Sequence, residues 1–153
     1  MVRAGVLVDG GGMELEEAEA RARFGSVPVA RLATADATGR PHVVPVTFAV
    51  EGDRVLVAVD GKPKRTRRLR RLRNIRENPR VAVLADVFDP EDWSRLWWVR
   101  ADGTARVLDA PELLAGPLDL LAARYRQYRD ARPAGPVIEI TVERWLGWSG
   151  ADG

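Results

Sequence analysis

The chain has 153 residues, of which 46% are hydrophobic and 30% are charged. This length and composition indicate one globular domain, exclude a disordered chain, and leave no apolar run long enough to span a bilayer. The sequence has no cysteine and one histidine, His42, which excludes thiol catalysis, disulfides and metal sites built from cysteine or clustered histidines. The lack of cysteine fits a reducing compartment, so we expect a cytoplasmic protein.

The N-terminal residues, 1–12, contain a short apolar piece and end in three consecutive glycines. They lack the long hydrophobic region and the small-residue cleavage site of a signal peptide. We therefore expect a flexible extension over 1–12, with Met13 as a candidate alternative start, followed by a single domain over 13–150. At the start of that domain, the spacing of apolar residues predicts a helix over 13–24.

The next segments alternate apolar and polar residues with the period of a β-strand. Residues 27–35 form the first predicted strand, which we expect to be buried on both faces. Residues 36–40 form a turn, with glycine where a positive φ is needed. Residues 41–50 form the second strand. Because Pro45 cannot donate a hydrogen bond to a ladder, this part of the strand should lie at a sheet edge or a bulge.

After a tight hairpin turn, the chain continues with a third strand over 54–60 and a helix over about 65–77 that ends before Pro79. The apolar residues of this helix form one narrow stripe: Leu69, Leu72 and Ile75. The later elements are a strand over 81–88, a long strand or hairpin over 94–109 with a kink at 101–103, a helix over 111–130 interrupted near Gly116–Pro117, and a closing strand over 136–150. Six strands joined largely by hairpins predict a mainly β fold, an antiparallel barrel with flanking helices.

The most unusual stretch is residues 61–80, GKPKRTRRLRRLRNIRENPR. It contains ten of the 24 lysines and arginines but only one of the 22 acids, Glu77. The other 133 residues therefore have 14 basic and 21 acidic side chains, a net charge of −7. The two lysines of the chain, Lys62 and Lys64, lie at the start of this stretch. An acidic body with one concentrated cationic site predicts a ligand with several negative charges.

Three interpretations of the basic stretch stay open. One is a solvated surface, although like charges at helical i, i+4 spacing, such as Arg67 and Arg71, repel each other. Another is a nucleic-acid site, which is disfavoured by the net acidic body and by the lack of a helix-turn-helix, finger or aromatic RNA-binding motif. The third fits best. It is a small anion at the strand-to-helix junction, where Lys62 and Lys64 precede the N-terminal N–H groups of the helix.

The chain offers few other groups for chemistry. Trp97 and Trp98 are adjacent in a predicted strand, so they point to opposite faces, and one of them must meet a dimer contact or a cleft wall against a planar ring. His42 is expected to be a structural hydrogen-bonding group. The acids within 86–92 indicate a turn rather than a metal site. An enzyme without its own acid, base or nucleophile must take its chemistry from an organic redox cofactor.

Two motifs bring these observations together: ATADATGRPHVVPVTF over 33–48 and DGKPKRTRRLRRLRNIRENPR over 60–80. In this order, and with GWSG at 147–150, they resemble the split β-barrel flavin and deazaflavin oxidoreductases, the pyridoxamine-phosphate-oxidase-like proteins. The resemblance is closest to the actinobacterial branch that depends on coenzyme F420, and it covers roughly residues 25–150. It implies a six-stranded antiparallel Greek-key split barrel that works as a homodimer, with two cofactor sites at the interface.

The resemblance also implies which residues bind the cofactor. The ring system would lie along 43–47, near the edge left by Pro45, and the phosphate would meet the basic loop. Residues of the partner subunit would close the pocket, and positions 93–98 are candidates for this role. The cofactor-binding residues predicted in this way are Val44, Pro45, Val46, Thr47, Asp60, Lys62, Lys64, Arg65, Thr66, Arg68, Trp97 and Trp98.

The activity implied by the resemblance is hydride transfer from reduced coenzyme F420 to a planar, conjugated organic substrate, with no catalytic side chain and no metal. The phosphodiester and oligoglutamate tail of F420 would suit a basic track along Arg65, Arg68 and Arg71. FMN, with a single phosphate, is the alternative cofactor. A non-catalytic carrier or flavin-binding sensor is the alternative class of protein. We expect neither a nucleic-acid nor a membrane partner.

Overall fold

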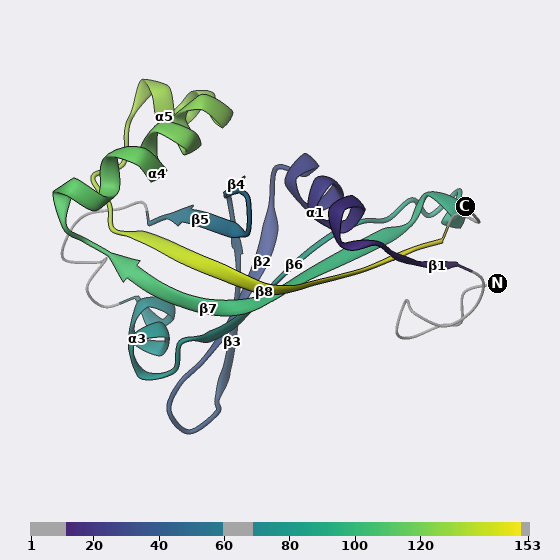
Figure 1. Cartoon of the computed structure of the whole chain (residues 1–153), viewed down its shortest axis with the longest axis horizontal. Coiled ribbons are helices and arrows are strands. Elements are labelled where there is room, and N and C mark those ends of the chain that lie inside the picture. The colour runs from purple at the N-terminus through teal and green to yellow at the C-terminus, as the bar shows by residue number, and fades with distance from the viewer. Residues whose placement is uncertain (1–11, 60–68, 151–153) are drawn as a thin grey trace.

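The computed structural model describes residues 12–59 and 69–150 (Figure 1). None of the helices in these two ranges is long and apolar enough to cross a membrane. The elements are, in chain order, β1 (Met13–Leu15), α1 (Glu17–Ser26), β2 (Ala30–Ala35), β3 (Pro41–Val46), β4 (Ala49–Glu51), β5 (Arg54–Ala58), α3 (Arg70–Glu77), β6 (Arg80–Val87), the short 3-10 helix η1 (Trp93–Arg95), β7 (Trp97–Leu108), α4 (Pro111–Arg124), α5 (Arg126–Asp130) and β8 (Val137–Ser149).

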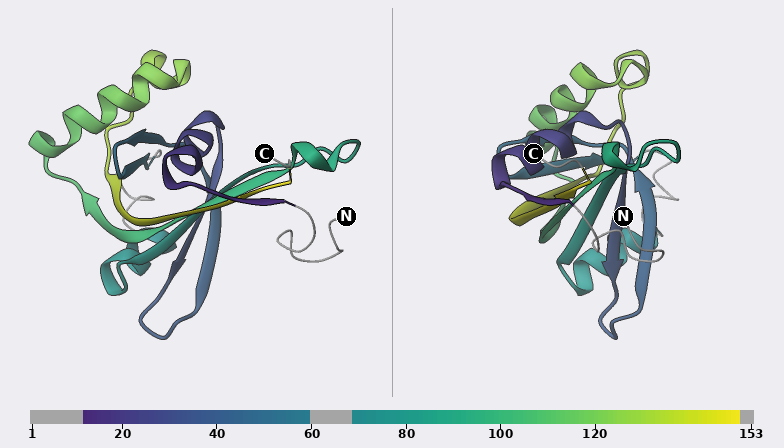
Figure 2. Two further views of the ribbon diagram at one scale, coloured as in Figure 1. Left: turned by 45° about the vertical axis from the view of Figure 1, so that its right-hand side comes forward. Right: turned by 90° about the vertical axis from the view of Figure 1, so that its right-hand side faces the viewer.

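The strands form one antiparallel sheet in the order β3-β2-β6-β7-β8-β5-β4, and β1 pairs with the end of β8. Only Thr47 and Phe48 connect β3 to β4, so a two-residue crossing joins the two edge strands of the sheet. Figure 2 shows β2 and β3 running across the direction of β7 and β8, so the sheet is strongly curved. The predicted antiparallel barrel with flanking helices is therefore confirmed.

The described part of the barrel has eight strands, whereas six were expected. One of the two extra strands arises because residues 41–50 divide into β3 and β4 at the crossing. The other is β1, in a segment predicted as the first turn of a helix, which instead pairs with Gly147–Ser149 of β8. The helix consequently begins after β1, and it buries Ala20 and Phe24 against the barrel. Three residues show too little periodicity to reveal a pairing partner at the other end of the domain.

The first predicted strand is shorter and less buried than expected. β2 begins at Ala30 rather than at residue 27. Leu32 and Thr34 are buried on its inner face, but Arg31 on its outer face is exposed. The prediction of burial on both faces was wrong because the outer face of β2 is left uncovered by other elements of the described chain.

A β-bulge divides the longest pair of strands into two parts. β7 is continuous, so the kink expected at 101–103 is not a turn between two strands. Instead, the register between β7 and β8 shifts between Asp102 and Gly103 and leaves Glu143 as an extra residue on β8. On one side of the bulge β8 pairs with β1, and on the other side it pairs with β5. The bulge therefore separates the barrel wall from a projecting arm (Figure 1). The arm consists of β1, the part of β7 before the bulge and the part of β8 after it.

The predicted helix over 111–130 is two helices, and its break is not at Gly116–Pro117. α4 continues through this pair and buries Pro117 and Leu118 on the side that faces β4, β5 and β8. Burial of this apolar side offsets the backbone hydrogen bond that a proline inside a helix cannot make. The break falls at Tyr125, whose extended backbone separates α4 from α5.

Two apolar clusters hold these elements together. The main cluster fills the barrel and includes the fully buried Phe24 and Phe48. α3 adds Leu72 and Ile75 to this cluster. The second cluster lies between α4 and the outer side of β4, β5, β7 and β8. α3 and α4 thus cover different parts of the barrel, and α3 lies within the basic stretch 61–80.

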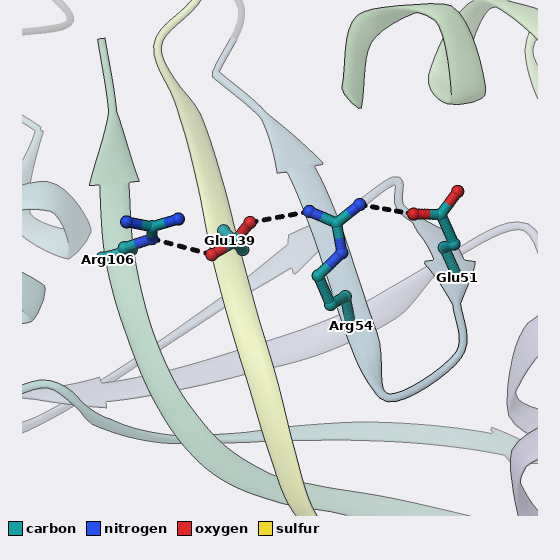
Figure 3. Close-up of polar contacts among 4 residues, drawn as sticks. All are labelled: Glu51, Arg54, Arg106 and Glu139. Atoms are coloured by element: carbon teal, nitrogen blue, oxygen red, sulfur yellow. Dashed lines mark hydrogen bonds and ion pairs between the residues drawn. The ribbon is translucent and has the colours of Figure 1, made fainter. Parts of the chain in front are cut away.

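A buried carboxylate ties together β5, β7 and β8 (Figure 3). The side chain of Glu139 is 9% exposed and accepts hydrogen bonds from Arg54 Nη1 at 2.8 Å and from Arg106 Nε at 2.7 Å. Arg54 also contacts Glu51 on β4. Burial opposes the charge of Glu139, but the hydrogen bonds from Arg106 and Arg54 outweigh burial and hold the pKa of this carboxyl below its ordinary value.

We expect Glu139→Gln to lower the free energy of unfolding by about 1–2 kcal/mol at pH 7, because two charge-assisted hydrogen bonds to half-exposed arginines are weakened. A pKa that is lowered in the folded state stabilises the protein above the unfolded-state value of about 4.3, and this contribution is lost as the pH falls through the folded-state value. The difference in stability between variant and wild type, measured by urea unfolding, should therefore shrink below about pH 4.

Glu51→Gln provides a matched control for this prediction, because Glu51 contacts the same arginine but its side chain is 53% exposed. Its effect at pH 7 should be smaller. A Glu139→Gln difference that is the same at pH 3 as at pH 7 would contradict the assigned role of the ionised carboxylate.

Candidate functional site

Half of the predicted cofactor-binding residues lie outside the described ranges. These residues belong to the segment 60–68: Asp60, Lys62, Lys64, Arg65, Thr66 and Arg68. The structure describes both flanks of the segment. Val59 is buried after the end of β5, and Leu69 precedes the first residue of α3. These flanks, together with β2 and β3, define the part of the candidate site that the structure describes.

α3 has the buried stripe and the end that the sequence predicts. The residues of the stripe pack in or against the main core: Leu69, Leu72 and Ile75. The helix ends before Asn78 and Pro79, as expected, but it begins only at Arg70, because Leu69, which was predicted to be helical, has an extended backbone. Its first turn contains no acid and begins with Arg70 and Arg71. Because the dipole at a helix N-terminus disfavours cations, two arginines there are more stable when an anion is close by.

Four polar side chains gather where α3 packs on the inner face of β2: Thr34, His42, Arg71 and Asn74. Asn74 is 1% exposed, and its Nδ2 donates to Thr34 Oγ1 at 3.0 Å. Thr34 lies opposite His42 in the register of β2 and β3, so the two side chains share one face of the sheet. Arg71 lies one turn before Asn74 on α3. We call these four residues the polar cluster.

The polar cluster contains every buried side-chain polar atom that lacks a hydrogen-bond partner within the described ranges: His42 Nδ1, Arg71 Nε and Asn74 Oδ1. Leaving such an atom unpaired costs roughly 1–3 kcal/mol, so buried polar atoms usually meet water or a ligand. Burial lowers the pKa of the Arg71 guanidinium. The Arg71 guanidinium and the His42 imidazole can donate to a small anionic group, whereas Asn74 Oδ1 is an acceptor and needs a donor.

The sequence patterns predict only part of this cluster. His42 was expected to be a structural hydrogen-bonding group, but its Nδ1 has no partner among the residues described. Arg71 was expected only as a contact for the cofactor tail, and Thr34 and Asn74 were not expected at the site. The signal that reveals them is geometric: the turn over 36–40 sets Thr34 opposite His42, and Arg71 and Asn74 are three residues apart on one helix.

β3, the strand along which the cofactor ring is predicted to lie, is an edge strand, as Pro45 requires. The side chains of Val44 and Val46 pack in or against the main core, whereas Pro45 is exposed. Thr47 follows β3 in the crossing, and its Oγ1 lies 2.7 Å from the hydroxyl of Tyr128. The predicted ring strand thus has one free edge, next to a hydroxyl pair.

The predicted tryptophans lie on opposite faces of β7, as expected for neighbours in a strand. Trp97 is 8% exposed and belongs to the main core, while Trp98 packs against Trp148 on the other face. The exposed aromatic pair of this region is Phe88 and Trp93, whose ring centroids are 6.2 Å apart. The sequence patterns did not single out Phe88, because an isolated aromatic residue after a strand has no diagnostic spacing.

The acids that follow β6 build a turn, as predicted, whereas Asp86 lies within β6 and pairs with Trp98 of β7. Asp89 Oδ1 accepts a hydrogen bond from the backbone of Glu91 at 3.0 Å. Asp92 Oδ1 accepts from the backbone and the hydroxyl of Ser94 at 3.0 and 2.6 Å. Within the ranges that the structure describes, no three His, Asp or Glu residues are grouped so that they could hold a metal ion.

Comparison with protein families gives this geometry a context. Residues 16–149 match the family model described as pyridoxamine 5'-phosphate oxidase. The chain belongs to the pyridoxamine 5'-phosphate oxidase family. The matched region includes the polar cluster, the edge strand β3, the crossing and the segment 60–68.

A curated protein of Streptomyces rimosus, 5a,11a-dehydrotetracycline/5a,11a-dehydrooxytetracycline reductase, is 37% identical to this family member over 78 residues. The aligned region is 51% of this chain and 54% of the S. rimosus protein, so the match spans about half the length of the curated relative.

Solved structures share the fold. An FAD-binding protein from Mesorhizobium loti aligns over 90% of this chain and 96% of its own, with 21% identity and a TM-score of 0.67. The heme storage protein HutZ from Vibrio cholerae aligns over 85% and 92%, with 20% identity and a TM-score of 0.67. An FAD-binding protein from Mycobacterium smegmatis aligns over 88% and 97%, with 20% identity and a TM-score of 0.57. At these identities the likeness establishes the split-barrel fold, which hosts different ligands.

Proposed function

We propose that this family member is an oxidoreductase that transfers hydride from reduced coenzyme F420 to a planar, conjugated organic substrate. The observation that carries the proposal is the polar cluster, whose unpartnered atoms lie at a helix that directly follows the basic segment 60–68. An anionic cofactor would accept hydrogen bonds from Arg71 and His42 and would neutralise the basic segment. The family supports redox chemistry with an organic cofactor, and the S. rimosus relative is named as a reductase of dehydrotetracyclines.

In this proposal the phosphate of the cofactor lies between the basic segment and the polar cluster. Lys62, Lys64 and Arg71 supply the positive charge, and His42 supplies a hydrogen bond. The ring lies along the free edge of β3. When bound, the cofactor supplies the hydride, while the chain orients the ring, excludes water and holds the substrate against the exposed ring face.

Two features favour F420 over FMN. Residues 33–48 and 60–80 resemble the F420-dependent branch. In addition, α3 presents a row of exposed arginines, Arg70, Arg73 and Arg76, which an oligoglutamate tail would neutralise and a single phosphate would not need. FMN is the second candidate, and the small size of the polar cluster favours it, since the described donors there suffice for one phosphate.

We also propose that the cofactor site is shared between two copies of the chain. The outer face of β3 and β6 presents apolar side chains to solvent, with Val43 61% and Leu84 39% exposed, beside the exposed Pro45. On the arm, Phe88 and Trp93 form a second exposed apolar patch. Exposed apolar patches of this kind are typical of surfaces that pack against a partner. A second copy is the partner that would also complete a pocket along the edge of β3.

Titration of the purified protein with coenzyme F420 and, separately, with FMN tests the proposal. We expect tight binding of F420, weaker binding of FMN, and a sedimentation mass of two chains. Reduced F420 should then be oxidised in the presence of conjugated cyclic ketones. If only FMN binds tightly, FMN is the cofactor instead of F420. Binding without turnover of any substrate would indicate a carrier or sensor. Binding of neither cofactor would contradict the proposal.

A further inference from the structure

The crossing contains Thr47, a residue of the proposed ring site, yet it lies outside the strand ladders. The last pair of β3 is Val46 with Ala30, and the first pair of β4 is Ala49 with Leu56. Backbone groups between these pairs have no neighbouring strand to bond with, so they need other partners. Those partners come from the junction of α4 and α5, which lies beside β4 in Figure 1.

Three side chains of the α4–α5 junction hold the crossing: Arg124, Tyr125 and Tyr128. The Tyr125 hydroxyl accepts from Phe48 N at 3.1 Å and lies 2.9 Å from Phe48 O. Arg124 Nη1 donates to the same oxygen at 2.8 Å, and its guanidinium lies 4.6 Å from the centre of the Phe48 ring. Arg124 also donates to the carbonyl of Val27, and the Tyr125 hydroxyl contacts the carbonyl of Pro28. Both carbonyls lie just before β2. The crossing is therefore fixed to the start of β2 by contacts from one junction.

Tyr128 makes the contact that reaches the side chain of Thr47. Its hydroxyl lies 2.7 Å from Thr47 Oγ1, and its ring packs edge-on against Tyr125 with centroids 5.6 Å apart. A phenol is a stronger acid than an alkyl alcohol, so we assign Tyr128 as the donor in this pair. The hydrogen of the Thr47 hydroxyl is then directed away from Tyr128 and is available to a ligand.

The break between α4 and α5 explains how one junction makes all of these contacts. In an unbroken helix, Arg124 and Tyr125 would point about 100° apart around the axis. The extended backbone of Tyr125 instead brings both side chains to the carbonyl of Phe48. α5 then places Tyr128 over Thr47.

We propose that Tyr128 is a positioning residue that orients the Thr47 hydroxyl toward the cofactor ring, while Arg124 and Tyr125 fix the backbone on which Thr47 lies. The inference rests on the proposed function, since it names what Thr47 does at the ring site. It gives the α4–α5 junction a role in cofactor binding that acts through the crossing, without any contact between Tyr128 and the cofactor.

The test replaces Tyr128 by phenylalanine, which keeps the ring and removes the hydroxyl. We expect Tyr128→Phe to bind coenzyme F420 about three- to tenfold more weakly, the loss typical of one hydrogen bond. The absorption maximum of the bound deazaflavin should shift, and the affinity for inorganic phosphate should not change. Arg126→Gln is the matched control, because Arg126 lies on the same helix with its side chain 85% exposed, and this variant should change neither affinity nor spectrum.

A double variant distinguishes positioning from a general effect on structure. If Tyr128 acts through Thr47, then Thr47→Val and the double variant Thr47→Val/Tyr128→Phe should bind F420 equally well. Two outcomes would overturn the inference even if the wild type binds F420. One is a double variant whose loss of F420 affinity is the product of the two single losses, and the other is an unchanged affinity and spectrum in Tyr128→Phe. If Tyr128→Phe does not fold, Thr47→Ser must keep the affinity that Thr47→Val loses. Failure of the wild type to bind F420 would overturn the proposed cofactor, and this inference with it.

Discussion

Replacement of Arg71 by methionine is expected to weaken the binding of inorganic phosphate and of the phosphate-bearing cofactor about ten- to a hundredfold. A charge-assisted hydrogen bond of the kind proposed for Arg71 is worth roughly 1.5–3 kcal/mol, which accounts for a change of this size. In the ligand-free protein the same substitution should leave the melting temperature unchanged or raise it. The Nε of Arg71 is buried without a partner in the described chain, and methionine keeps the apolar stem without the charge.

Opposite effects on affinity and stability would mark Arg71 as a binding residue, because binding sites often keep groups that destabilise the empty protein. Arg73→Met is the matched control for the binding of inorganic phosphate, which lacks the tail proposed to contact Arg73, since Arg73 is exposed on the same helix and undergoes the same chemical change. Calorimetric titration and thermal unfolding of both variants measure the two effects. A lower melting temperature for Arg71→Met with unchanged affinity would make Arg71 a structural residue.

If the segment 60–68 completes the site, Lys62→Ala/Lys64→Ala should weaken cofactor binding at least about tenfold.

Gly103→Ala is expected to lower the free energy of unfolding by about 3 kcal/mol, because a methyl group at this position overlaps backbone rather than a movable side chain. A Cβ on Gly103 would lie 2.1 Å from the carbonyl oxygen of Thr141 and 3.1 Å from the Cα of Val142. Both atoms belong to β8, next to the bulge that separates the arm from the barrel wall. Urea unfolding at neutral pH measures the change.

Gly116→Ala is the control for this prediction. Gly116 lies inside α4, and a Cβ added there would meet nothing within 4 Å. Alanine is more favourable than glycine in a helix interior, but a side chain on the residue before Pro117 is disfavoured in helical geometry, so the two effects oppose each other and the free energy of unfolding should change by less than about 1 kcal/mol. A Gly103→Ala protein as stable as the wild type would show that the two strands separate at the bulge more easily than their register indicates.

The features predicted correctly from the sequence depend on a few neighbouring residues. Pro45 cannot donate to a ladder, so its strand was expected at an edge or a bulge, and it lies at an edge. Leu72 and Ile75 are three residues apart, so they had to share one face of a helix. The features predicted wrongly depend on distant partners. β1 exists because β8 lies beside it, and the helix over 111–124 continues past Pro117 because burial against the second cluster offsets a lost hydrogen bond.

The features of the candidate site also divide into those set by neighbouring residues and those set by distant partners. The concentration of charge in 61–80 is a property of composition and is visible in the sequence alone. The polar cluster is not, because it requires the register of the hairpin that holds Thr34 and His42 and also the rotation of α3 that turns Asn74 inward. The contact between Thr47 and Tyr128 joins residues 81 positions apart, and nothing in the sequence around either residue indicates the other.

The pairing of β8 has a consequence for the order in which the protein is made. β8 pairs with β7 along its length, with β5 at one end and with β1 at the other, and it follows all three in the chain. On the ribosome, therefore, β1, β5 and β7 emerge before the strand that joins them. Until β8 arrives, each of them exposes an open edge and an apolar face that invite pairing with other chains. We expect the barrel to close only after β8 has been synthesised, with nascent chains depending on chaperones until then.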